Sequence, residues 1–241
     1  MILKLPITKK NRGYFLAFMT LLGALVFSSC NKNDDIQTAQ PATGSIKFLN
    51  ALPKYSSLDF YLGNQRATNP ALLLGQSTGY FSVYTGTGEV YAVTGGTFQI
   101  LGGTTLNIEN GKNYSIFSTT KSTADNADTV LVIQDNLTAP AAGKAKVRFA
   151  NFVSDNSAAL DLGTQGGTAN LFTNYAFNAS TDFIEVDPGT YVFQIKDTGT
   201  STVKASSTST TIASGRIYTV WAKGRASGSG TTAIGIQVSE N

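Results

Sequence analysis

The chain has 241 residues, of which 18 are basic and 15 acidic, and it contains one cysteine and no histidine. Without histidine the chain has no Ser–His or Cys–His nucleophile and no imidazole metal ligand. The length suits one large domain or two of ordinary size. Abundant Gly, Ser, Thr, Tyr and Phe favour short strands joined by turns.

Residues 1–29 have the three parts of a secretory signal peptide: a basic front, a short apolar run and small residues before a cleavage site. The apolar run, Tyr14 to Phe27, is fourteen residues long, whereas a membrane-spanning helix needs about 20. The alternative interpretation is an uncleaved N-terminal anchor with an incidental cysteine. Cleavage would remove the four basic residues of the front, which are Lys4, Lys9, Lys10 and Arg12.

The only cysteine, Cys30, follows directly in the sequence "FSSC". This sequence resembles the lipobox of bacterial lipoproteins, although Phe27 stands where leucine is commonest. The resemblance implies that Cys30 carries a diacylglycerol thioether, becomes the first residue of the mature chain and anchors it in a membrane. Since Cys30 has no second cysteine to pair with, the chain has no disulfide framework.

The mature chain would carry 14 basic and 15 acidic residues, so it lacks the basic surplus that nucleic-acid binding requires. Its first part, residues 30–43, is polar and has no hydrophobic period, which predicts a flexible tether. Lys32, Asp34 and Asp35 resemble the lipoprotein export signal of Bacteroidetes, which implies the outer face of the outer membrane. An acidic tether without a sorting role is the alternative. The expected location is the cell envelope, as an outer-membrane lipoprotein whose surface exposure stays open.

The rest of the chain contains an internal repeat. "SIKFLNALPKYSSLDFYL" from Ser45 is similar to "KVRFANFVSDNSAALDLG" from Lys146, and five such blocks recur in the same order. In the last block, residues 131–134 match residues 234–237. The repeat predicts two homologous domains, which we expect to fold separately. Their expected bounds are residues 44–137 and 144–241, with residues 138–143 as a linker.

Within each repeat the apolar residues alternate. Ile46 and Phe48 share one face of a strand, and Val147 and Phe149 do the same with Arg148 pointing outward. About seven short strands in about 95 residues are typical of an Ig-like sandwich. An up-and-down barrel fits less well because the blocks are unevenly spaced. The predicted fold is therefore all-β, with two tandem Ig-like antiparallel β-sandwich domains after the signal peptide and tether.

Two stretches carry a family resemblance. "KVRFANFVSDNSAALDL" and "FIEVDPGTYVFQI" resemble the family called domain of unknown function 4397, whose members are exported bacterial proteins, often with tandem copies. The first repeat departs from the family pattern because Thr85 replaces Pro188 of the second repeat. The resemblance implies a β-sandwich and an envelope location. It implies no established activity.

Four polar residues recur at matched positions, and a structural role is expected for each. An asparagine at a strand end closes a turn on its own backbone, and an isolated aspartate caps a turn or faces solvent. The alternatives are a glycosidase carboxylate pair and a calcium site in residues 125–128 or 154–161, although neither segment has EF-hand spacing. We expect no catalytic residue, no metal and no cofactor. The four residues are Asn50, Asn151, Asp59 and Asp161.

The aromatic residues divide into two groups. Those at matched strand positions are expected in the cores: Phe48, Phe149, Tyr114, Tyr218, Phe117 and Trp221. The others are candidate ligand contacts, since an apolar ring face suits a pyranose ring. These candidates are Tyr80, Tyr84, Tyr91, Phe172 and Tyr175.

The sequence thus predicts a lipid-anchored, non-catalytic binding or adhesion module of the cell envelope. Its expected partners are the membrane, through the lipid, and a glycan or an envelope protein, with no nucleic acid. One alternative is a purely structural spacer, and another is a glycan-binding accessory protein of polysaccharide uptake. A row of exposed aromatic rings would favour binding, and a featureless polar surface would favour the spacer.

Overall fold

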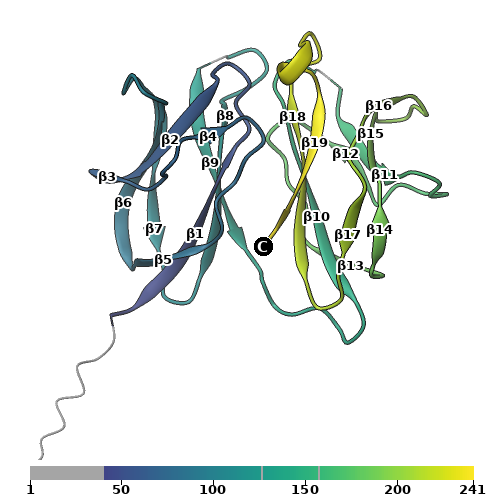
Figure 1. Ribbon diagram of the computed structural model, residues 1–241, viewed down its shortest axis with the longest axis horizontal. Coiled ribbons are helices and arrows are strands. Elements are labelled where there is room, and N and C mark those ends of the chain that lie inside the picture. The colour runs from purple at the N-terminus through teal and green to yellow at the C-terminus, as the bar shows by residue number, and fades with distance from the viewer. Residues whose placement is uncertain (1–40, 126, 157) are drawn as a thin grey trace, which may run out of the picture. The chain divides into compact units, whose positions relative to one another are not determined.

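The computed structural model describes residues 41–241 apart from residues 126 and 157. The predicted signal peptide, Cys30 and most of the predicted tether lie outside the described residues. Within the described part, no helix is long and apolar enough to cross a membrane. Figure 1 shows an almost purely β structure.

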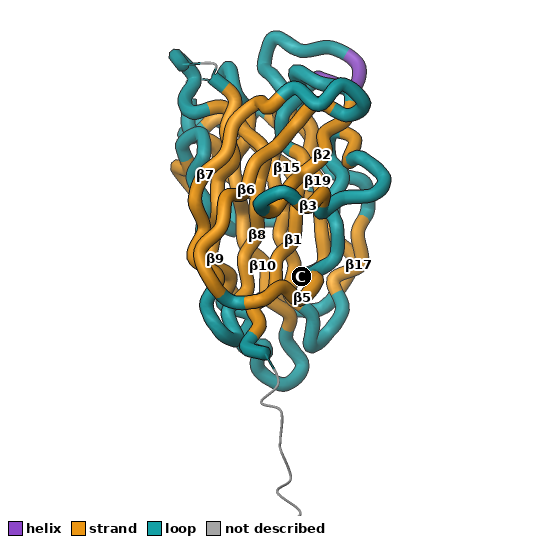
Figure 2. Tube along the Cα trace, turned by 90° about the vertical axis from the view of Figure 1, so that its left-hand side faces the viewer, coloured by secondary structure: helices purple, strands orange, loops and turns teal. Residues whose placement is uncertain are grey.

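The first repeat folds into two sheets. One has the strand order β5-β1-β8-β9, and the other has the order β3-β2-β6-β7 with β4 pairing to β2. Figure 2 turns the second of these sheets toward the viewer. The strands are β1 (Thr43–Asn50), β2 (Ser57–Leu62), β3 (Gln65–Arg66), β4 (Leu72–Leu73), β5 (Phe81–Tyr84), β6 (Gly86–Thr94), β7 (Ile100–Ile108), β8 (Asn113–Thr120) and β9 (Asp128–Asp135).

The second repeat has the same arrangement. Its two larger sheets have the orders β13-β10-β18-β19 and β12-β11-β15-β16, and β14 pairs with β17. The elements are β10 (Ala145–Val153), β11 (Leu160–Thr164), β12 (Phe172–Tyr175), β13 (Ile184–Val186), β14 (Gly189–Tyr191), β15 (Phe193–Asp197), β16 (Val203–Ser206), β17 (Thr210–Ile212), β18 (Ile217–Gly224), the 3-10 helix η1 (Gly230–Thr232) and β19 (Gly235–Glu240).

The predicted fold class is confirmed: the described chain is all-β and forms two tandem sandwiches. The described strand pairs are antiparallel except β1–β8 and β10–β18, which are parallel. The same exception occurs at the same place in both repeats, as expected for a duplicated unit.

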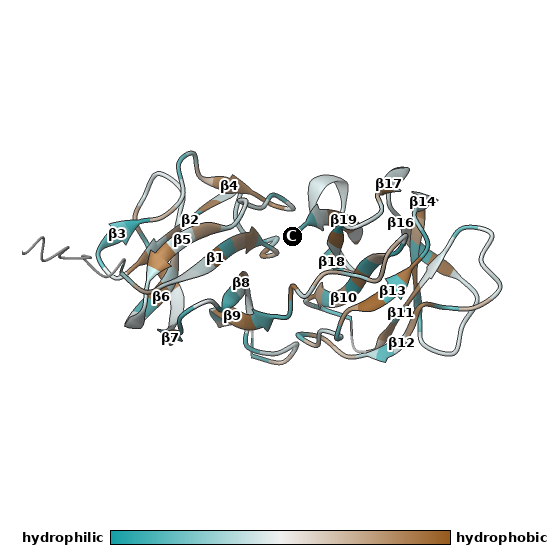
Figure 3. Cartoon of the chain, turned by 90° about the horizontal axis from the view of Figure 1, so that it is seen from below, coloured by the Kyte–Doolittle hydropathy of each residue, from teal (hydrophilic) through white to brown (hydrophobic). Residues whose placement is uncertain are grey.

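Alternate apolar residues of the first strand of each repeat point into the core of that sandwich. Ile46 and Phe48 are fully buried in the first core, and Val147 and Phe149 are fully buried in the second. The Phe48 ring stacks on Phe60 of the facing sheet with centroids 4.7 Å apart. Figure 3 shows apolar and polar residues alternating along β10.

The last block of the repeat is aligned three residues further along than the sequence comparison suggested. Val132 pairs with Ile116 in the first sandwich, and Val238 pairs with Val220, the repeat equivalent of Ile116, in the second. Residues 131–134 therefore correspond to residues 237–240. The sequence match was therefore wrong by an odd number of residues, and an odd shift exchanges the two faces of a strand.

A third apolar cluster lies between the two sandwiches and belongs to neither core. The Phe117 ring stacks on Phe152 at 4.4 Å and meets Trp221 edge-on at 5.8 Å. Phe117 and Trp221, expected in the cores of their own domains, are therefore buried against the opposite sandwich. Residues 41–241 form one compact unit. The cluster consists of Leu49, Ala51, Phe117, Ala150, Phe152 and Trp221.

Arg148 also differs from the expectation. It does point away from the core of its own sandwich, but it is only 1% exposed. Its guanidinium pairs with Asp135 of the first sandwich at 2.5 Å. Alternation predicted the side of the strand correctly, whereas the neighbour covering that side comes from the other repeat.

Candidate functional site

Four side-chain positions form a row across the outer face of the sheet β3-β2-β6-β7. Tyr61 of β2 lies opposite Arg66 of β3 on one side and Tyr91 of β6 on the other, and Tyr91 lies opposite Gly103 of β7. The neighbours of Tyr61 and Tyr91 along their strands include fully buried core residues such as Phe60. Since successive side chains alternate between the faces of a sheet, the two tyrosines point outward.

The aromatic rings of this row are in mutual contact. Tyr61 and Tyr91 stack with centroids 5.3 Å apart and planes inclined by 8°. Phe98, in the hairpin between β6 and β7, meets Tyr61 edge-on at 5.3 Å. Phe98 is 57% exposed and has a φ of 51°, which is uncommon for a bulky residue and costs about 1–3 kcal/mol. The hairpin therefore presents this ring to solvent at the expense of backbone strain.

Gly103 leaves a space beside the Tyr91 ring. A Cβ atom at residue 103 would lie 2.6 Å from the Tyr91 Cβ atom and 2.6 Å from the Val90 carbonyl oxygen, so the position accepts only glycine without rearrangement. The cavity at this place has a volume of about 430 Å³, which is in the range of small-molecule sites. Its lining residues are Asn64, Glu89, Val90, Tyr91, Ile100, Gly103, Thr104 and Thr105.

The rim of this cavity is polar and carries one charged side chain, Glu89. The nearest cation of the row, Arg66, is held by an ion pair with Asp59 at 2.7 Å. An apolar ring face therefore stands beside exposed amide, hydroxyl and carboxylate groups. Within the described residues, no group of three or more metal-ligating side chains is close enough to hold a metal ion.

The second sandwich has the same sheet without the rings. The equivalents of Tyr61, Tyr91 and Gly103 are Gly163, Gln194 and Ser206, which occupy neighbouring positions in one row. Gly163 is buried, because the side-chain oxygen of Asn170 would lie 2.9 Å from a Cβ atom there. The second copy of the fold therefore forms this row without aromatic residues, so the fold as such does not require the rings of the first sandwich.

The structure does not bring the five candidate ligand contacts together. Tyr91 lies in the row described above, and Tyr84, at the end of β5, is 73% exposed. Tyr80 donates a hydrogen bond to Asp135, and burial raises its pKa. Phe172 is only 6% exposed, in the core of the second sandwich, and Tyr175 packs edge-on against that core.

Sequence analysis missed Tyr61 and Phe98. Tyr61 stands between the core residues Phe60 and Leu62, and this alternation was a usable signal that its ring faces outward. Phe98 comes two residues after the glycine pair Gly95-Gly96, which indicates a turn and therefore a surface position. Gly103 gave no signal, because its neighbour Tyr91 is known only from the strand pairing.

The repeated polar residues hold local structure. The side-chain oxygens of Asn50 and Asn151 accept hydrogen bonds, each at 3.1 Å, from the backbone N–H two residues ahead. Asp59 pairs with Arg66. Asp161 accepts hydrogen bonds from the Asn174 backbone at 2.8 Å and from the Thr198 hydroxyl at 2.7 Å.

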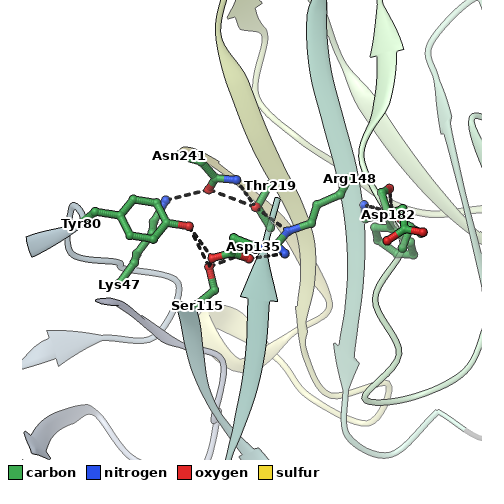
Figure 4. Close-up of polar contacts among 10 residues, drawn as sticks. Lys47, Tyr80, Ser115, Asp135, Arg148, Asp182, Thr219 and Asn241 are labelled. Carbon is green, nitrogen blue, oxygen red and sulfur yellow. Dashed lines mark hydrogen bonds and ion pairs between the residues drawn. The ribbon is translucent and has the colours of Figure 1, made fainter. Parts of the chain in front are cut away.

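A second polar cluster lies at the junction of the two sandwiches (Figure 4). Arg148 contacts Asp135 and donates a 3.0 Å hydrogen bond to Ser115. Lys47 donates to the Glu240 carbonyl at 2.5 Å and to the Asn241 side chain at 3.0 Å. Burial, and next the charge of Arg148, lowers the pKa of Lys47 to about 8.

The junction has the pattern of a self-complementary dimer. Lys47 and Arg148 are repeat equivalents, and each reaches the end of the last strand of the opposite sandwich. Asp135 and Asn241 are also equivalent, since they lie opposite Asn113 and Ile217, which match in the repeat. Such reciprocal contacts are typical of two-fold interfaces. The junction thus joins two copies of one unit, whereas the aromatic row belongs to the first copy only.

The fold and its surface define a class: a tandem β-sandwich protein with an aromatic surface site on one of its two sandwiches. The chain belongs to the family described as domain of unknown function (DUF4397), whose model matches residues 44–163 and residues 153–241. No curated protein matches the chain significantly.

Several solved structures have low similarity. A family CBM26 module from Eubacterium rectale Amy13K, solved with maltoheptaose, has 10% identity and a TM-score of 0.26, covering 83% of this chain and 97% of that one. A Bacteroides eggerthii protein provisionally described as a cell adhesion protein has 12% identity and a TM-score of 0.20, covering 83% and 95%. The Bacillus anthracis TIE protein has 9% identity and a TM-score of 0.24, covering 76% and 34%. These likenesses are too low to indicate a shared function.

Proposed function

We propose that this protein is a non-catalytic binding module of the cell envelope, anchored through a lipid on Cys30, which presents the aromatic site of its first sandwich. The observation that carries the proposal is the half-buried Tyr91 ring, which lines a cavity together with Gly103. Because the second sandwich builds the same sheet with Gln194 at that position, the fold does not require an aromatic ring there, and ligand binding accounts for it.

The residue types favour binding over catalysis. The chain has no histidine, which is the usual general base near neutral pH. Asp59 and Asp161, the two repeated carboxylates, are each tied to partners within their own sandwich. A glycosidase would need two carboxylates on either side of one bond.

The anchoring part of the proposal rests on the signal-peptide pattern and the lipobox around Cys30. About a dozen tether residues would separate the lipid from β1 and span about 20 Å as a flexible coil. To test it, cells are labelled with a clickable fatty acid, and wild type is compared with Cys30→Ser. We expect labelling of the wild type alone, and equal labelling of both would refute the anchor.

The binding part is tested with residues 41–241, which form a compact unit by themselves. Glycan and peptide arrays are probed with the wild-type chain, with Tyr91→Ala and with the matched control Gln194→Ala, beside a panel of hydrolase substrates. We expect binding that is lost in Tyr91→Ala and kept in Gln194→Ala. Turnover of a substrate, or no Tyr91-dependent binding on either array, would contradict the proposal.

The second candidate function is a structural spacer, which the buried junction favours. The Arg148–Asp135 pair and the apolar cluster around Trp221 join the two sandwiches firmly, as a rigid stalk requires. A spacer has no use for a ligand site, so loss of Tyr91 would leave the spacing function of such a protein unchanged.

A further inference from the structure

We infer that the cavity beside Tyr91 binds a neutral pyranose unit of a glycan chain, an inference that rests on the binding function proposed above and names its ligand class. The site is built from the Tyr91 ring, the backbone of Gly103 and polar residues on β6, on β7 and in the turn between β2 and β3.

The shape of the cavity suits a sugar ring. Tyr61 stacks on one side of Tyr91, whereas the cross-strand neighbour on the other side is Gly103, which has no side chain. The volume of about 430 Å³ beside the ring accommodates one sugar ring with its substituents. A flat ligand would lie against the tyrosine ring and over the glycine backbone.

The polar groups around the cavity match the hydroxyl groups of a sugar. A pyranose has an apolar C–H face and a rim of hydroxyl groups, and the C–H face packs on the electron-rich face of an aromatic ring. The hydroxyl rim would meet the Asn64 amide, the Glu89 carboxylate and the Thr105 hydroxyl, which belong to exposed residues that line the cavity. Amides and hydroxyls both donate and accept, so they match the hydroxyl groups of a sugar.

The charge of the lining residues favours a neutral sugar. Glu89 is the one charged residue among the lining residues, and Arg66 is held by Asp59. An anionic sugar would therefore face a negative carboxylate without a free cation to compensate it. The site selects a neutral ligand.

The site also extends beyond one sugar ring. Phe98 and Ile100 are 57% and 60% exposed, and Ile100 lines the same cavity. They offer apolar contacts to the next residue of a chain, in the direction of the hairpin between β6 and β7. An oligosaccharide should therefore bind more tightly than a monosaccharide.

The test uses residues 41–241 and isothermal titration with neutral hexasaccharides of glucose, xylose and mannose, with an oligogalacturonate as the anionic probe and a phenylalanine-containing peptide as the non-sugar probe. We expect at least one neutral hexasaccharide to bind and Tyr91→Ala to weaken it about tenfold or more. Gln194→Ala should change the affinity less than about twofold. Glu89→Gln should reduce the discrimination against oligogalacturonate.

Folding of each variant is checked by the dispersion of its amide NMR spectrum, and the same spectra locate the ligand through shifts at residues 91 and 103–105. Absence of neutral-sugar binding by the folded wild type, or equal binding by Tyr91→Ala, would overturn the inference. Peptide binding that depends on Tyr91, without sugar binding, would overturn the sugar assignment and leave the proposed binding function standing. No Tyr91-dependent binding of any probe would remove both.

Discussion

Lys47 and Arg148 show how the surroundings of a residue depend on the opposite repeat. Both follow an apolar residue of a first strand and face away from their own core, yet each is buried at the junction. Arg148 has a carboxylate partner in Asp135, whereas Lys47 has a carbonyl and an amide. Buried charge without a full counter-charge is unfavourable. Charged Lys47 therefore contributes less to the stability of the folded chain than its repeat equivalent Arg148.

This difference predicts a pH dependence of stability. Burial lowers the pKa of Lys47 to about 8 in the folded chain, against an ordinary value of about 10.4 when unfolded. Between these values the unfolded chain binds more protons, so the free energy of unfolding rises with pH. We expect a gain of about 1 kcal/mol between pH ~7 and pH ~9, measured by urea denaturation of residues 41–241.

The control for this prediction is Lys47→Met, which keeps the length of the side chain and removes the titration. In this variant the rise between pH ~7 and pH ~9 should be absent. The measurement stops below pH ~10, where unfolded tyrosines ionise and the raised pKa of Tyr80 makes folding less favourable as the pH increases. A rise of equal size in Lys47→Met would show that another group is responsible.

At the scale of elements, the hairpin β6–β7 has a register shift between Ala92 and Val93 and two positions where only glycine fits without rearrangement. β7 contains two adjacent glycines, of which Gly103 faces the Tyr91 ring and Gly102 approaches β9. Glycines inside strands often mark places where a backbone or a ligand approaches closely. Gly102 allows the backbone of β9 to approach β7 closely, and Gly103 leaves room for the cavity beside the Tyr91 ring.

Gly103→Ala should destabilise the fold by about 1–3 kcal/mol, because the new Cβ atom would overlap Tyr91 and the Val90 carbonyl and overpacking has costs of this size. The matched control is Gly88→Ala on the partner strand β6, where a Cβ atom meets nothing within 4 Å. Urea denaturation of both variants compares them. Equal stability of the two would mean that β7 shifts freely and that the opening beside Tyr91 is not sterically maintained.

At the scale of the whole described unit, the two sandwiches share a buried junction with both apolar and ionic contacts. The repeat predicts that the two sandwiches fold separately. The stability of each also depends on the other, since each sandwich covers Trp221, Phe117 or Arg148 of the other. Isolated, either sandwich would expose an apolar face of the kind that promotes association.

We expect residues 41–241 to unfold in one cooperative transition, because the junction couples the sandwiches. Trp221→Ala should lower the stability by about 3–5 kcal/mol and separate the transition into two. Near-UV circular dichroism and the amide NMR spectrum, followed through the same urea titration, distinguish one transition from two. Two transitions in the wild type would show that the junction contributes little to stability.

The sequence by itself determined the all-β class, the duplication and the core-facing residues of the first strand of each repeat, because alternating side chains and turn residues act over a few neighbouring positions. It also indicated the roles of Asn50 and Asn151, whose hydrogen bonds run to the backbone two residues ahead. Alternation further placed Arg148 on the side of its strand away from the core.

Only the tertiary structure decided what covers that side. Arg148 meets Asp135, and Trp221 meets Phe117, across the junction, whereas Tyr91 borders a cavity on the side of its cross-strand neighbour Gly103. Each of these outcomes depends on which distant strands lie side by side and in which register, and a one-residue slip would change every pair. Local sequence specifies the face of a side chain, and the pairing of remote strands specifies whether that face becomes core, junction or binding site.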